Sequence, residues 1–101
     1  MKVRIILAED HTIMREGLRT LLEKQQNFEV VAEAGDGRTA VRLTQELLPD
    51  VVVMDVNMPD LNGIEATRQI ITDNPGIKVI ALSMYSDKQF IVEMLQAGAS
   101  G

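Results

Sequence analysis

The chain contains no cysteine and no tryptophan, and its only aromatic residues are Phe28, Tyr85 and Phe90. Without cysteine it can form neither a disulfide framework nor a thiolate metal site, which fits a reducing compartment such as the cytoplasm. Because aromatic side chains are scarce while 46% of the residues are hydrophobic, the core has to be aliphatic. Long apolar runs are also missing. The first run, Ile5 to Ala8, is far too short for a signal-peptide core or a membrane span.

Basic side chains are a minority as well. Ten lysines and arginines face fifteen acidic residues, which gives a net charge of -5 at pH 7. Proteins that grip nucleic acid or an anionic membrane need a basic face. We therefore expect this segment to bind neither. At 101 residues the chain is close to the commonest domain size, so residues 1–101 are expected to form one domain.

Apolar runs and amphipathic stretches alternate four times along the chain. Strands are predicted at residues 3–8, 28–34, 51–55 and 78–83, and apolar residues recur at helical spacing after each of them. This alternation is typical of an α/β fold with a parallel sheet and right-handed crossovers. Asp10 or Thr12 is expected to cap the first helix. The inward faces of the four helices are predicted to be Met14, Leu18, Leu21 and Leu22; Ala40, Leu43, Leu47 and Leu48; Ala66, Thr67, Ile70 and Ile71; and Phe90, Ile91, Met94 and Leu95.

Polar side chains stand where three of the predicted strands end. Asp55 closes a run of four apolar residues that is typical of a strand buried on both faces of a parallel sheet. Glu9 and Asp10 follow the first strand, and Ser83 ends the fourth. Parallel sheets bind ligands outside the carboxyl ends of their strands. Since these ends share one edge of the sheet, the four side chains are expected to meet there.

Such a group of side chains suits phosphoryl chemistry. Three neighbouring carboxylates repel one another and would raise some of their own pKa values unless a cation holds them ionised. Hard oxygen ligands without histidine or cysteine favour Mg²⁺. Asp55 could then attack phosphorus as a nucleophile, with Mg²⁺ neutralising the phosphoryl oxygens and Ser83 bonding one of them. A simpler explanation remains open for each residue, since Asp often starts turns and Asp10 could be a helix cap. His11 could approach the metal, but a single histidine in the first turn of a helix is more often exposed.

These motifs resemble the receiver domains of two-component response regulators. The resemblance covers the whole chain and is carried by Glu9-Asp10, by residues 55–63 and by Ser83. It implies a flavodoxin-like, doubly wound parallel sheet in the order 2-1-3-4. The implied function is a phosphoacceptor signalling domain rather than an enzyme, although such a domain can catalyse its own phosphorylation and dephosphorylation.

The resemblance also implies a role for each site residue. Asp55 would accept a phosphoryl group from a phosphohistidine of a sensor histidine kinase. Glu9 and Asp10 would bind Mg²⁺ directly or through water, together with Asp55 and the backbone carbonyl of Asn57. Ser83 would be the switch hydroxyl that moves toward the phosphoryl group.

Two further stretches, residues 8–11 and 82–87, look like the subfamily whose receivers precede a LuxR-type helix-turn-helix domain. This implies transcriptional control, with DNA as a partner of the longer parent protein.

Receivers also carry a fifth strand and helix and an invariant lysine, which the chain does not match before it ends at Gly101. We therefore expect a domain that is incomplete at its C-terminus, in which Mg²⁺ binding survives better than phosphotransfer. The bare edge strand 78–83 would favour self-association or domain swapping. Together with the missing lysine, this gives the alternative of a phosphorylation-deficient receiver fragment that self-associates.

Two other functions compete with this interpretation. Residues 35–40 fit G-x-G-x-x-A, with Asp55 about 20 residues beyond Gly35, as in a dinucleotide-binding module. That reading leaves Glu9, Asp10 and Ser83 unexplained, and a tight turn before a helix accounts for the glycines. Haloacid-dehalogenase-like phosphatases also use a strand-end Asp nucleophile, but their second acid is here Asn57. An amide cannot serve as the acid and base of turnover.

Overall fold

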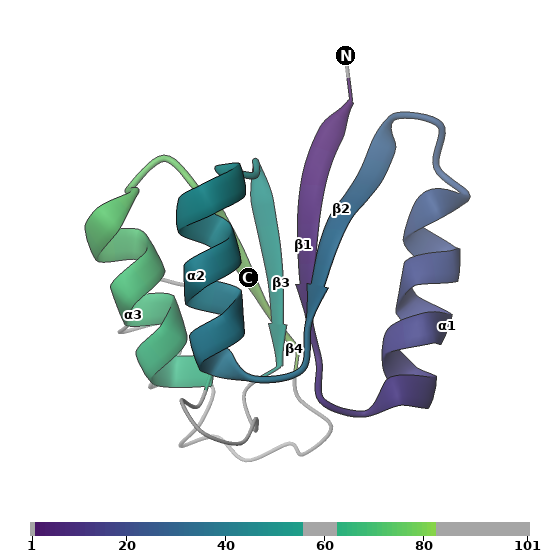
Figure 1. Cartoon of the computed structure of the whole chain (residues 1–101). Coiled ribbons are helices and arrows are strands. Elements are labelled where there is room, and N and C mark those ends of the chain that lie inside the picture. Colours follow the sequence, from purple (N-terminus) through teal and green to yellow (C-terminus); the bar gives the residue numbers. More distant parts are fainter. Residues whose placement is uncertain (1, 56–62, 83–101) are drawn as a thin grey trace.

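The computed structural model describes residues 2–55 and 63–82, in which strands and helices alternate (Figure 1). None of the helices in this described part is long and apolar enough to cross a membrane. The predicted last helix, around Phe90 and Leu95, lies outside the described residues. The elements are β1 (Val3–Ala8), α1 (Thr12–Glu23), β2 (Phe28–Ala34), α2 (Gly37–Leu47), β3 (Val51–Asp55), α3 (Gly63–Asp73) and β4 (Lys78–Leu82).

The four strands form one parallel sheet in the order β2-β1-β3-β4. The predicted flavodoxin-like order is thus confirmed. In the register of the sheet, Ala8 of β1 lies beside Met54 of β3, and Asp55 lies beside Leu82 of β4. The carboxyl ends of β1, β3 and β4 therefore share one edge, as expected from their common direction.

Helices cover the sheet on both sides, with α1 on one face and α2 and α3 on the other (Figure 1). The side chains beneath α2 and α3 form the larger core cluster, which is aliphatic as the composition predicted. The four apolar residues before Asp55 alternate between the two faces, so β3 is covered from both sides. The fully buried members under α2 and α3 include Ile6, Val52, Met54, Ile70 and Val79.

Helix α1 departs from its predicted packing. Leu18 and Leu22 pack against the smaller cluster of Ile5, Leu7, Val30 and Val53, but no residue of α1 is fully buried. Met14 and Leu21, also predicted to face inward, are 37% and 60% exposed. At 100° per residue these two side chains lie on the flank of the apolar stripe, which is wider than the strip of helix that touches the sheet.

The N-terminal cap of α1 also differs from the prediction. His11, rather than Asp10 or Thr12, occupies the cap position, and no side chain caps this helix. Thr12 is already the first helical residue, and the Asp10 carboxylate turns toward the His11 ring instead of the helix. The backbone carbonyl of His11 accepts the first helical hydrogen bond, from the N–H of Arg15.

Both ends of α2 are well defined. Asp36 Oδ1 accepts the backbone N–H of Thr39 at 2.8 Å, which confirms a turn and helix start at the glycine pair. At the other end, Leu48 has a left-handed backbone with φ of 48° and an exposed side chain. Its predicted inward orientation is wrong, because a left-handed residue after the last turn leaves the direction of the helix.

Candidate functional site

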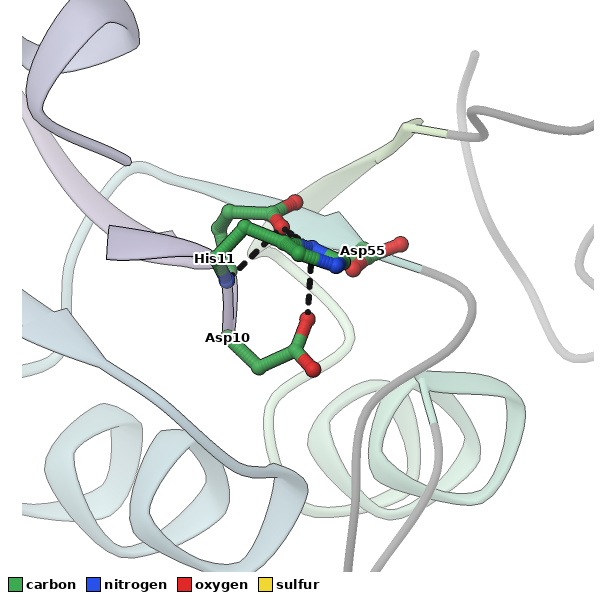
Figure 2. A group of neighbouring side chains, drawn as sticks. Asp10, His11 and Asp55 are labelled. Atoms are coloured by element: carbon green, nitrogen blue, oxygen red, sulfur yellow. Dashed lines mark hydrogen bonds and ion pairs between the residues drawn. The ribbon is translucent and has the colours of Figure 1, made fainter. Parts of the chain in front are cut away.

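The carboxyl ends of β1 and β3 bring three carboxylates to one point. Glu9 follows β1, and its backbone N–H donates to the carbonyl of Ala34 at 2.9 Å, which fixes it beside β2. Asp55 is the last residue of β3. One ligand atom each from Glu9, Asp10, His11 and Asp55 lies within 4.8 Å of the others (Figure 2). The expected convergence of Glu9, Asp10 and Asp55 is therefore present.

The carboxylates differ in their exposure to water. Glu9 and Asp55 are only 1% and 3% exposed, whereas the Asp10 side chain is 28% exposed. Glu9 Oε1 accepts the backbone N–H of His11 at 3.1 Å and lies 2.7 Å from His11 Nδ1. Asp10 Oδ1 is shielded from water and has no hydrogen-bond partner among the described residues. A shielded carboxylate oxygen that makes no hydrogen bond favours the approach of a cation.

His11 is the basic side chain of this group. The hydrogen bond that Glu9 accepts from the ring raises the pKa of the His11 imidazole, and the neighbouring charges of Asp10 and Asp55 act in the same direction. Its Nδ1 is also within ion-pair distance of Asp10 Oδ1, at 3.1 Å. The ring is 60% exposed, as the sequence led us to expect, yet it contacts both acidic neighbours (Figure 2).

Arg15 of α1 is a contributor that the sequence analysis missed. Its Nη1 donates to the backbone carbonyl of Glu9 at 2.8 Å, and its Nε lies 3.5 Å from Glu33 Oε1 of β2. The same side chain passes beside Gly35, where an added Cβ would stand 3.2 Å from the guanidinium. Arg15 thus ties the helix to the loop that carries the acidic pair. The sequence feature that could have predicted this contact is the position of Arg15, one turn into the helix that follows Glu9 and Asp10.

The other predicted site residues, Asn57 and Ser83, lie outside the described residues. Their approach to Asp55 stays a prediction. Within the described part, the donor set consists of three carboxylates and one imidazole, and the oxygens fit a hard divalent cation. A carboxylate held beside such a cation can also act as a nucleophile toward phosphorus.

Sequence comparison relates the chain to signalling proteins. The family model described as the response regulator receiver domain matches residues 5–101. The transcriptional regulatory protein DegU of Brevibacillus brevis is 44% identical over 100 residues, which cover 99% of this chain and 42% of DegU. The chain therefore spans less than half the length of this curated relative.

Solved structures agree with the sequence comparison. A two-component response regulator of the LuxR family from Aurantimonas sp. SI85-9A1 superposes with a TM-score of 0.94 at 42% identity, over 100% of this chain and 72% of that one. The response regulator domain of Thermotoga maritima CheB gives a TM-score of 0.92 at 36% identity, over 99% of this chain and 75% of that one. Both similarities extend over the sheet edge that carries Glu9, Asp10 and Asp55.

Proposed function

Because the chain belongs to the response regulator receiver domain family, we propose that residues 1–101 act as a receiver domain that accepts a phosphoryl group on Asp55. The donor is a phosphohistidine of a sensor histidine kinase. The observation that carries the proposal is the gathering of Glu9, Asp10 and Asp55 at the carboxyl edge of the sheet. Family membership also disfavours the dinucleotide-binding and phosphatase alternatives.

The proposal assigns Mg²⁺ to the acidic cluster. The carboxylates of Glu9, Asp10 and Asp55 would hold it, together with the backbone carbonyl of Asn57. The donor set supports this assignment, since it is rich in oxygen and one carboxylate oxygen of Asp10 makes no hydrogen bond among the described residues. When bound, Mg²⁺ supplies positive charge that offsets the charge of the incoming phosphoryl oxygens.

The chain's own residues then have distinct tasks. A carboxylate oxygen of Asp55 forms a bond to phosphorus as the bond from phosphorus to the donor imidazole nitrogen breaks, and the imidazole keeps the electron pair. Strand β3 holds Asp55 almost fully buried, which fixes the direction of attack and limits access of water. Ser83 donates a hydrogen bond to a phosphoryl oxygen and reports the modification to the surrounding surface. The domain is a phosphoacceptor that can catalyse its own phosphorylation and dephosphorylation.

The proposal extends to the setting of the domain. The names of the relatives point to transcriptional control, so we assign DNA binding to an output domain of the whole protein rather than to this acidic segment. We also assign the domain to the cytoplasm, a reducing compartment that fits its lack of cysteine. Self-association through the edge strand 78–83 is a further proposal, supported by Ile80 of β4, which is 41% exposed.

The test is the intact mass after incubation with Mg²⁺ and a small acyl-phosphate donor. We expect a gain of one phosphoryl group that requires both Mg²⁺ and Asp55, so that Asp55→Asn and a chelator each abolish it. Asp73→Asn, an exposed aspartate at the end of α3, is the matched control and should gain the group normally. No gain in a folded wild-type sample, or an equal gain in Asp55→Asn, would contradict the proposal and favour a phosphorylation-deficient fragment or another acceptor.

A further inference from the structure

His11 turns back toward the two carboxylates that precede it in the chain. Its Nδ1 lies 2.7 Å from Glu9 Oε1 and 3.1 Å from Asp10 Oδ1 (Figure 2). The backbone of His11 is extended, with φ of -84° and ψ of 111°, and its N–H donates to the same Glu9 oxygen. The imidazole is therefore held within the acidic cluster by two contacts to Glu9.

These separations bring the ligand atoms close to the spacing of neighbouring ligands on one metal ion. With metal–ligand distances of about 2.1 Å, two ligands stand about 3.0 Å apart at right angles and about 3.4 Å apart at the tetrahedral angle that Zn²⁺ favours. The Nδ1 atom lies slightly closer to its two oxygens, at 2.7 and 3.1 Å, and the four candidate atoms are all within 4.8 Å of one another. A cation could thus replace the proton between His11 and Glu9 with only small movements of the side chains.

A second observation points to a ligand at the same place. Asp10 Oδ1, one of the two oxygens that His11 faces, is shielded from water and has no hydrogen-bond partner in the described part of the chain. His11 reaches this oxygen only as an ion-pair contact. A metal ion between the imidazole and the two carboxylates would satisfy that oxygen and replace the contact.

We propose that His11 is a fourth side-chain ligand of this site and gives it a preference for Zn²⁺ and similar transition metals over Mg²⁺. Imidazole nitrogen suits Zn²⁺, whereas Mg²⁺ selects oxygen ligands. Mg²⁺ would use the carboxylates alone and leave the His11 ring, which is 60% exposed, uncoordinated. The inference rests on the proposed function in one respect, because both metals share Glu9, Asp10 and Asp55.

The test compares Zn²⁺ and Mg²⁺ binding by titration calorimetry in the wild type, in His11→Ala and in His11→Gln. We expect both substitutions to weaken Zn²⁺ binding about ten-fold or more, and Mg²⁺ binding less than about three-fold. Thr12→Ala, which changes the neighbouring exposed residue, is the matched control and should leave both affinities unchanged.

A spectroscopic measurement makes the role of the ring explicit. His11 is the sole histidine of the chain, so its ring resonances in a proton–nitrogen NMR spectrum need no further assignment. Zn²⁺ should shift the Nδ1 resonance strongly, and Mg²⁺ should not. If Mg²⁺ binds but the Zn²⁺ affinity is the same in His11→Ala, the inference is wrong and the proposed function stands. If Zn²⁺ binds through His11 while the folded wild type binds no Mg²⁺, the inference stands and the proposed metal role in phosphotransfer is wrong.

Discussion

Individual acidic residues have very different surroundings in this chain, although several follow a strand in the same way. Asp36 lies at a helix N-terminus, where the backbone N–H of Thr39 lowers its pKa. Glu9 is buried and faces the His11 ring. The turn sequence around Asp36 was enough to predict a helix start. The position of His11 could not be predicted, because it depends on the backbone angles at one residue and on the space that Glu9 and Asp10 leave.

The cap at Asp36 leads to a prediction about stability. Asp36→Ala should lower the free energy of unfolding by about 1 kcal/mol at neutral pH, since the Thr39 N–H loses its acceptor. The pKa of Asp36 is lower in the folded chain than its ordinary value of 3.8. Its charge therefore stabilises the fold fully above pH 3.8, and this contribution is lost as the pH falls through the folded pKa. Urea unfolding of the wild type and the variant between pH 7 and pH 3 measures both effects.

Asp36→Asn is the control for the charge. Asparagine also caps helices well, so this variant should retain most of the stability at pH 7. The difference between wild type and Asp36→Ala should shrink below pH 4, whereas the difference between Asp36→Asn and Asp36→Ala should not depend on pH. Equal stability of Asp36→Ala and wild type at pH 7 would show that the cap contributes nothing.

At the scale of elements, the strands were more predictable than the helix faces. The continuous apolar run of β3 indicated a covered strand, and the alternation of strands and helices indicated a parallel sheet. The order of the strands came from the resemblance to receiver domains. The apolar stripe of α1 correctly predicted a helix, but it overestimated how far the side chains of Met14 and Leu21 are buried. Periodicity shows which residues share a face and does not show how much of that face another element covers. Ile13, Met14 and Leu21 consequently form an exposed apolar surface on α1.

The edge strand carries a prediction about association. Among the described residues β4 pairs only with β3, and Ile80, beside Val53 in the register, is 41% exposed. An unpaired, apolar strand edge is a template for pairing with another chain, and a lysine on such an edge disfavours it. Ile80→Lys should weaken self-association about ten-fold or more, measured by size-exclusion chromatography with light scattering over a concentration series.

Gln69→Lys introduces the same charge on an exposed position of α3 and should associate like the wild type. This pair separates an effect of the edge from an effect of net charge. A wild-type chain that stays monomeric at every concentration would show that β4 does not pair between copies. Equal association of all three chains would place the contact elsewhere on the surface.

At the scale of the whole molecule, charge and topology act together. The net charge of -5 was evident from composition, and the parallel topology concentrates part of it at one edge of the sheet. Three ionised carboxylates held close together repel one another in the folded state. Unfolding separates these charges, so a cation that binds the cluster should stabilise the folded chain as a whole.

We therefore expect Mg²⁺ to raise the melting temperature. At ten times its dissociation constant, an ion that binds only the folded state adds about 1.4 kcal/mol, or about 5 to 10 °C for a domain of this size. The measurement is thermal unfolding followed by circular dichroism, in Mg²⁺ and in NaCl of equal ionic strength to account for screening. Asp10→Asn removes one charge from a partly exposed side chain, so it should keep the fold and lose most of the Mg²⁺ effect. Asp73→Asn, far along the chain on α3, should keep the full effect. An identical rise in NaCl, or an undiminished rise in Asp10→Asn, would mean that the cluster at the ends of β1 and β3 does not hold the ion.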